Sequence, residues 1–163
     1  MNTKTEKEFL IAYDSFSDAL FRYCYFKTGD RELAKDLVSD TFMKSWDYLS
    51  SGKEIENFRP FLYRLANNMV IDWYRKKKAL SLDSLAENGF DPPDATADTS
   101  QKAEIEQMMK ILGNLEQSDQ DLIIWRYVED LPIKDIATLL SENENTISVR
   151  LHRALHRLKE QLQ

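Results

Sequence analysis

The 163-residue sequence is poor in residues that interrupt helices or cross-link chains. Its four glycines and four prolines leave little to break a helical pattern, which favours an all-α protein. The single cysteine, Cys24, excludes an internal disulfide framework and is typical of a reducing compartment, so we expect a cytoplasmic protein. No apolar run approaches the length of a membrane span, and residues 1–8 do not resemble a signal peptide. Direct insertion into a membrane is therefore not expected.

Motifs of enzymes and cofactor-binding proteins are also lacking. The sequence contains no glycine-rich phosphate loop and no Cys/His set with metal-site spacing. His152 and His156 are one helical turn apart, as in some zinc sites, but no third ligand is evident near them. We therefore expect no catalytic activity, no cofactor, no metal ion and no small-molecule substrate.

The net charge of −6 argues against non-specific nucleic-acid binding by the whole molecule. The charge is unevenly distributed: residues 1–78 carry +2, residues 79–103 carry −4 and residues 104–163 carry −4. A DNA-binding segment within the acidic C-terminal part would bind weakly alone. Such a segment would need a partner to hold it at its site.

A change of composition near the middle of the chain predicts two domains. Residues 80–101 contain Gly89 and the run Asp91-Pro-Pro-Asp94 and few apolar residues, which is typical of a linker. We therefore expect two small helical domains, over residues 1–79 and 104–163. A flexible acidic linker over residues 80–103 would join them.

The segment from Leu131 to Leu158 predicts a helix-turn-helix. Pro132 suits a first helical position, and Asn143 suits the N-cap of the second helix after a polar turn. The apolar face of this second helix is predicted to comprise Ile147, Leu151, Ala154, Leu155, Leu158 and Leu162. A separate polar stripe comprises Thr146, Arg150, Arg153 and Arg157. Such a helix fits the major groove of DNA, although an amphipathic hairpin with a solvated charged face shows the same pattern.

The N-terminal block predicts four helices, three of which have clear limits at Phe9–Lys27, Arg31–Leu49 and Phe61–Lys78. Gly29 suits a left-handed C-cap, Asp30 an N-cap and Pro60 a first helical position. Apolar residues at spacings of three and four predict the core-facing side of the first two helices, including Phe9, Tyr13, Leu20, Leu37, Phe42 and Trp46. On the third helix this side comprises Phe58, Leu62, Leu65, Ala66, Met69 and Trp73.

The opposite face of the third helix is unusual. Arg64, Asn68, Ile71 and Arg75 lie on one line, with Asn67 and Tyr74 beside it, and the helix ends in a basic run, Arg75-Lys-Lys-Lys78. Asparagine pairs with base edges, aromatic rings stack on unpaired bases, and basic groups hold phosphates. The combination predicts nucleic-acid binding. The basic run alone is better explained as a complement to the helix dipole.

Three segments match, in order, the motifs of one family. Asp36–Trp46 (DLVSDTFMKSW) is similar to its E-D-L-V-Q-E-T-F-L-R-A-W motif. Phe58–Arg75 (FRPFLYRLANNMVIDWYR) is similar to F-x-x-W-L-Y-R-I-A-R-N-x-x-x-D-Y-x-R, and the helix-turn-helix to I-A-x-x-L-x-x-x-x-G-T-V-x-x-R-L-x-R-A. Over nearly its whole length the chain thus resembles the extracytoplasmic-function (ECF, group four) sigma factors of RNA polymerase.

The resemblance implies a protein that binds core RNA polymerase and promoter DNA and helps to open the DNA. It places Asp36, Ser39 and Asp40 against the clamp helices of the largest polymerase subunit. It places five residues at the minus-ten element, Arg64, Asn67, Asn68, Ile71 and Arg75, and the loop Ser50–Asn57 around a flipped base. It assigns reading of the minus-thirty-five element to Ser148, Val149, His152 and Arg153, with Arg150 and Arg157 on phosphates.

The resemblance further implies an anti-sigma factor that holds the protein inactive, in some cases at the membrane. Two alternatives are an autonomous helix-turn-helix regulator, which usually requires a dimerisation surface and a palindromic site, and a two-domain helical adaptor. Glu142 and Glu144 make the predicted turn acidic. The turn therefore either faces away from DNA or lowers affinity and increases the dependence on polymerase.

Overall fold

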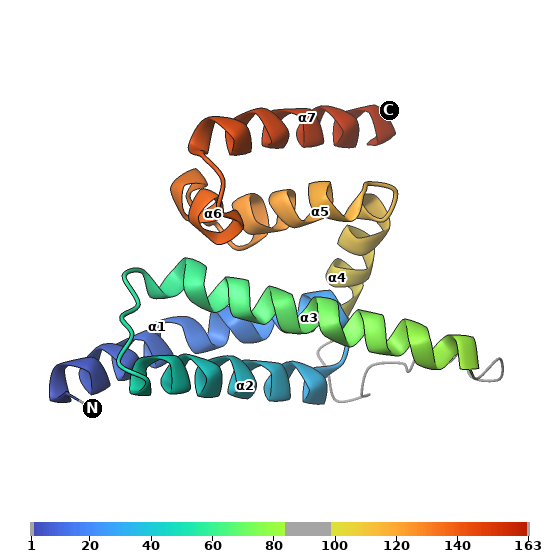
Figure 1. The fold of residues 1–163 in the computed structure, drawn as a ribbon. Helices are drawn as coiled ribbons and strands as arrows, with labels where there is room; N and C mark the ends of the chain where they lie inside the picture. Colours follow the sequence, from blue (N-terminus) through green and yellow to red (C-terminus); the bar gives the residue numbers. More distant parts are fainter. Residues whose placement is uncertain (1, 84–98, 163) are drawn as a thin grey trace. The chain divides into compact units, whose positions relative to one another are not determined.

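The computed structural model describes residues 2–83 and 99–162, and all regular structure in these ranges is helical (Figure 1). The described residues divide into two compact units on either side of the gap. The first unit contains α1 (Thr3–Thr28), α2 (Arg31–Ser50) and α3 (Phe58–Asp83). The second contains α4 (Thr99–Leu112), α5 (Gln117–Ile123), the π-helix η1 (Ile124–Val128), α6 (Ile133–Leu140) and α7 (Glu144–Leu162). The predicted all-α class with two helical domains is confirmed.

The ends of the helices differ from the predicted linker boundaries. α3 continues to Asp83 and α4 begins at Thr99, whereas the linker was expected over residues 80–103. Most of that stretch, residues 84–98, lies outside the described residues. Within residues 2–83 and 99–162, no helix has both the length and the apolar character needed to cross a bilayer.

Local capping explains the junction between α1 and α2. Gly29 adopts a left-handed conformation with φ 70°, and its N–H donates to the carbonyl oxygen of Tyr25 at 2.8 Å. The Asp30 carboxylate then accepts from the N–H of Leu33 at 3.1 Å and starts α2. Both capping predictions are confirmed.

The described part of the first unit contains three helices, so the prediction of four was wrong. The stretch Lys53–Asn57 is not helical. α3 begins at Phe58 because the Asn57 side chain accepts from the N–H of Arg59 at 3.3 Å. Pro60 is therefore the third residue of α3 rather than the first, still within the turn whose N–H groups have no helical partner.

The three helices of the first unit enclose one core. Tyr23 of α1 and Tyr63 of α3 are fully buried and meet edge to face, with ring centroids 5.3 Å apart. On α2, Thr41 and Ser45 are buried in this core. Their hydroxyls donate to backbone carbonyl oxygens one turn earlier in the helix, at 2.7 and 2.8 Å. These bonds satisfy polar groups that would otherwise be costly to bury. Because the inner side of α3 packs in this core, its outer side is available for contacts with other molecules.

In the second unit the helix-turn-helix is formed by α6 and α7. Asn143 caps α7 as predicted, accepting from the N–H of Thr146 at 2.8 Å. Pro132 precedes α6 instead of being its first residue, and α6 buries Ile136, Ala137 and Leu139. The apolar face of α7 buries Ile147, Leu151 and Ala154, whereas Leu162 is exposed at the end of the helix.

Candidate nucleic-acid and protein interfaces

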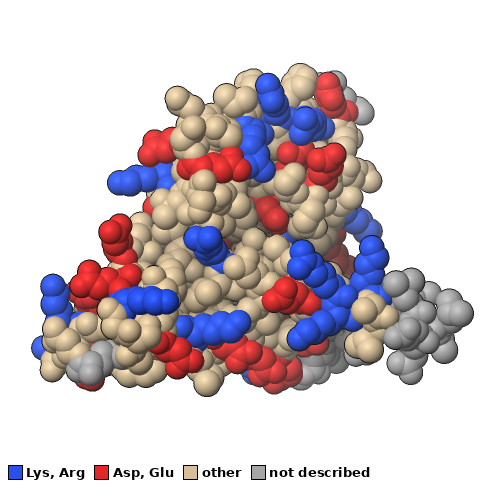
Figure 2. All heavy atoms as spheres, in the orientation of Figure 1, with Lys and Arg blue, Asp and Glu red and all other residues tan. Residues whose placement is uncertain are grey.

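The outer face of α3 presents a line of three polar residues and one exposed isoleucine. Arg64, Asn68, Ile71 and Arg75 are all exposed, at successive spacings of four, three and four residues. Among the described residues, Arg64, Asn68 and Arg75 make no ion pair or side-chain hydrogen bond. Figure 2 shows lysine and arginine side chains gathered over the C-terminal part of α3. This face therefore combines free donors with positive charge, as a nucleic-acid surface requires.

Asn67 is separated from this line. Its residue is only 8% exposed, and its side-chain oxygen accepts from the hydroxyl of Tyr23 at 3.2 Å. The resemblance to the sigma factors placed Asn67 at the minus-ten element together with its neighbour Asn68. A one-residue step rotates the side chain by about 100° around a helix, so Asn67 points into the core instead. We assign it a structural role and omit it from the candidate surface.

The C-terminal half of α3 is anchored to α1 by Tyr74. The Tyr74 hydroxyl donates to the backbone carbonyl of Lys27, and burial raises the pKa of this tyrosine above its ordinary value. The adjacent Trp73 ring meets Tyr74 edge to face at 4.8 Å and carries the Lys77 ammonium 4.8 Å from its centroid. These contacts fix the segment that bears Ile71 and Arg75, so the outer line is presented in one orientation.

The loop between α2 and α3 is also exposed. From Ser51 to Asn57 only Ile55 is partly buried, and Gly52 has a φ of 89° that a side chain would strain. At the base of the loop, the rings of Tyr48 and Phe61 lie 5.0 Å apart, and the Lys53 ammonium lies 5.1 Å from the Tyr48 centroid. The predicted base-receiving loop is thus next to the first turn of α3.

The residues predicted to meet polymerase share one face of α2. Asp36, Ser39 and Asp40 are exposed, and neither aspartate forms an ion pair with any described residue. Two unpaired carboxylates one turn apart suit a basic partner. This arrangement is consistent with a protein-binding surface.

Ser39 also lies in a groove of about 590 Å³ between α1 and α2. The groove has polar residues at Glu6, Ser39 and Asp47 and an otherwise apolar lining of Phe9, Leu10, Tyr13, Phe42, Met43 and Trp46. Leu10 is 59% exposed and Met43 64% exposed. The groove was not predicted from the sequence because its aromatic residues, Phe9, Tyr13, Phe42 and Trp46, have the spacing of core residues. One sequence feature could have indicated the groove: Leu10 and Met43 are apolar although they lie outside the helical spacing of the predicted core residues.

On α7, the four residues predicted to read bases are all exposed: Ser148, Val149, His152 and Arg153. Arg153 forms no ion pair within the described part of the chain. Arg150, in contrast, is paired with Glu142 of the turn, with Nη1 and Oε1 3.0 Å apart. The side chains predicted to read bases are therefore accessible, but the flanking Arg150 already forms an ion pair with Glu142.

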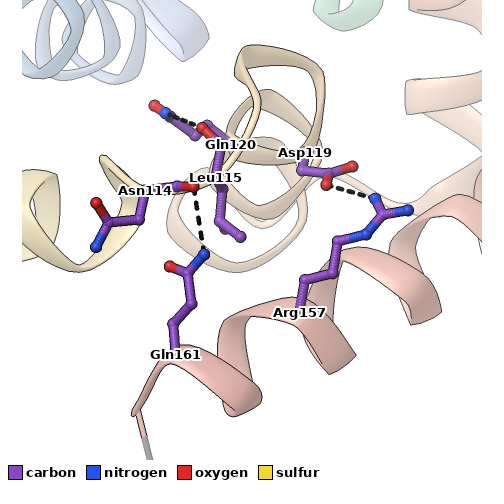
Figure 3. Close-up of polar contacts among 6 residues, drawn as sticks. All are labelled: Asn114, Leu115, Asp119, Gln120, Arg157 and Gln161. Carbon is purple, nitrogen blue, oxygen red and sulfur yellow. Dashed lines mark hydrogen bonds and ion pairs between the residues drawn. The ribbon is translucent and has the colours of Figure 1, made fainter.

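Arg157 also forms an ion pair, at the junction of α7 with α5 (Figure 3). Its Nη1 lies 2.6 Å from a carboxylate oxygen of Asp119, a residue that is only 7% exposed. This hydrogen bond raises the pKa of Arg157 above its ordinary value. One turn later, Gln161 donates to the carbonyl oxygen of Asn114 at 3.2 Å. Arg157, which was predicted to contact phosphate, thus holds α7 against the α4–α5 turn.

Arg157→Ala is expected to lower the midpoint of thermal unfolding by roughly 5 °C, because it leaves the buried Asp119 carboxylate without its partner. Circular dichroism at 222 nm measures the midpoint. The matched control is Arg153→Ala on the same helix, which should leave the midpoint unchanged. Equal midpoints for wild type and Arg157→Ala would contradict the structural role.

Two family models match the chain, one within each unit. Residues 12–80 match the model described as Sigma-70 region 2, and residues 105–158 match Sigma-70, region 4. Among relatives, the RNA polymerase sigma factor YlaC of Bacillus subtilis is 27% identical over 156 residues, which is 92% of this chain and 89% of that protein. The ECF RNA polymerase sigma factor SigW of Bacillus subtilis is 28% identical over 163 residues, covering 91% and 86%.

Two solved structures share the fold. One is CnrH in complex with the cytosolic domain of CnrY, with a TM-score of 0.71 and 19% identity over 96% of this chain and 88% of that one. The other is the sigma factor RpoE in complex with the anti-sigma factor NepR from Bartonella quintana, with a TM-score of 0.66 and 22% identity over 99% and 98%. On the two domain matches and the full-length relatives, the chain belongs to the ECF RNA polymerase sigma factors, a non-catalytic family that binds core RNA polymerase and directs it to promoters.

Proposed function

We propose that this sigma factor divides its task among three exposed surfaces. The α2 face of Asp36, Ser39 and Asp40 binds core polymerase. The α3 line contacts and helps to open the minus-ten element, and the N-terminal part of α7 reads the minus-thirty-five element. The observation that carries this proposal is the presence, in the family's order, of two matched units whose candidate contact residues are exposed and, on α2 and α3, unpaired among the described residues.

The DNA contacts follow from side-chain chemistry. On α3, Asn68 can exchange paired hydrogen bonds with a base edge, while Arg64 and Arg75 can bind flanking phosphates. On α7, Arg153 and His152 can donate to base edges, and Ser148 and Val149 are small enough to allow a close approach to the groove floor. Opening is driven by binding energy, because unpaired bases must gain contacts that offset the few kcal/mol lost on unstacking.

Replacement of both acids, Asp36→Lys with Asp40→Lys, is expected to weaken core-polymerase binding at least about tenfold, because like charges placed at an interface cost several kcal/mol. Binding of fluorescently labelled protein to core polymerase measures the loss. The control is Asp14→Lys with Asp18→Lys, which changes an exposed pair on α1 at the same spacing and by the same charge. If both double variants lose affinity equally, α2 is not the specific contact.

We further propose that an anti-sigma factor occupies the α1–α2 groove and that the protein is cytoplasmic, held near the membrane when its inhibitor is anchored there. Ser39 lies both on the α2 face and in the groove, so a helix seated in the groove covers part of the surface proposed for polymerase. Two proteins of this fold are known in complexes with a cytosolic domain and with an anti-sigma factor. Inhibitor and polymerase then compete by mass action. A helical inhibitor that binds but does not displace core polymerase would contradict this overlap.

A further inference from the structure

Acidic residues of the second unit hold two of the three arginines on α7. Arg157 is bound to Asp119, at the side of α7 that packs on α5. Arg150 is bound to Glu142, eight residues earlier, and both side chains of this pair are partly exposed, at 32% and 37%. The first contact buries a carboxylate and is structural. The second pair is partly open to solvent on both of its side chains.

The turn holds Glu142 in position for this contact. Ser141 adopts a left-handed conformation with φ 55° and ψ 42°, and the N–H of Glu142 donates to the carbonyl oxygen of Ala137 at 2.9 Å. Asn143 then caps α7. With the backbone held on both sides of Glu142, this residue is placed where its carboxylate reaches Arg150.

We propose that Glu142 competes with DNA phosphate for Arg150 and so limits the affinity of the helix-turn-helix for DNA. This inference rests on the proposed function, which places Arg150 beside the DNA backbone. While the pair is closed, Arg150 and Glu142 have no net charge together and release no counterion on approach to DNA. For Arg150 to bind phosphate the pair must open, and the freed carboxylate then faces the phosphate chain.

The alternative is that Glu142 orients Arg150 toward a DNA phosphate, and both the charge of the segment and the strength of the pair argue against it. A carboxylate that orients Arg150 would have to stay next to the negatively charged phosphate. The segment concerned, residues 104–163, already carries 11 acidic and 7 basic residues. An exposed pair is also weak enough for a phosphate to displace it. The device lowers the affinity of the free protein without preventing binding once polymerase holds the domain at its site.

The test uses the full chain and a fluorescein-labelled mixed-sequence 30-base-pair DNA duplex, because a phosphate contact does not depend on sequence. Anisotropy titrations at several salt concentrations give the affinity and its salt slope. Glu142→Gln should bind roughly three- to fivefold more tightly, the size expected for loss of an exposed ion pair. Its salt slope should steepen by about 0.9, the value for one added phosphate contact.

Two controls separate the pair from a general charge effect. Glu144→Gln removes the same charge two residues away, from an exposed residue that forms no ion pair among the described residues, and should change affinity less than about twofold. In an Arg150→Ala background, Glu142→Gln should give no further gain than Glu144→Gln does. A gain from Glu142→Gln no larger than that of the control, or weaker binding, would overturn the proposal.

Arg150→Ala distinguishes failure of this inference from failure of the proposed function. If Arg150→Ala weakens duplex binding while Glu142→Gln matches its control, α7 is the DNA surface and only the competition is wrong. If Arg150→Ala and Glu142→Gln both leave binding unchanged, the phosphate contact assigned to α7 is itself wrong.

Discussion

Asn68→Ala and Arg75→Ala are each expected to reduce promoter opening by roughly 5- to 150-fold, with polymerase binding unchanged. Loss of a base-edge contact, as proposed for Asn68, costs about 1–3 kcal/mol, and loss of a charged hydrogen bond to phosphate, as proposed for Arg75, costs about 1.5–3 kcal/mol. A tenfold change in an equilibrium corresponds to about 1.4 kcal/mol. Both side chains are exposed on the outer line of α3, away from the buried Leu62, Ala66 and Met69, so the fold should persist. We expect the double variant to lose the two contributions nearly in full, since the residues are two turns apart.

Permanganate reactivity of unpaired thymines in the polymerase–promoter complex measures opening. Asn67→Ala is the matched control, because the same residue type is removed one position away. It should lower thermal stability, since it removes the buried oxygen that accepts from the Tyr23 hydroxyl, whereas Asn68→Ala should not. Normal opening in both Asn68→Ala and Arg75→Ala would show that the α3 line does not contact the minus-ten element.

The free protein is expected to bind promoter duplex at least about 100-fold more weakly than the same protein with core polymerase. Residues 104–163 have a net charge of −4, and two of the three arginines on α7 are paired within the unit. An isolated module of this size makes few phosphate contacts, and non-specific affinities lie near 10⁻⁴–10⁻⁶ M. Polymerase raises the effective concentration of the module at its element. Gel shifts with and without core polymerase compare the two affinities, and equally tight shifts would indicate an autonomous regulator.

Much of the fold could be predicted because local signals and long-range packing agree. Gly29 with Asp30, and Asn143 before α7, are capping residues whose effect depends only on their neighbours. The start of α3 was misplaced because Asn57 and Pro60 are both plausible start signals. Only the observed bond from Arg59 to Asn57 decides between them.

The candidate surfaces were predicted less well than the fold. Helical spacing placed Arg64, Asn68, Ile71 and Arg75 together correctly, since one helix defines that line. The roles of Asn67, Arg150 and Arg157 depend on partners 44, 8 and 38 residues away in the sequence. No periodicity reveals such contacts. The groove escaped prediction for a similar reason, because residues that face a groove and residues that face a core have the same spacing.

Run-off transcription with purified components tests whether this chain directs RNA polymerase to promoters. Core polymerase is supplied with a genomic fragment library and assayed with and without the protein. We expect discrete transcripts from a small set of promoters only when core polymerase and the protein are both present. These transcripts should be lost with the double variant Asp36→Lys and Asp40→Lys, and with the double variant Asn68→Ala and Arg75→Ala. Specific transcripts from core polymerase alone, or none after addition of the protein across the whole library, would contradict the assignment of this chain as a promoter-directing sigma factor.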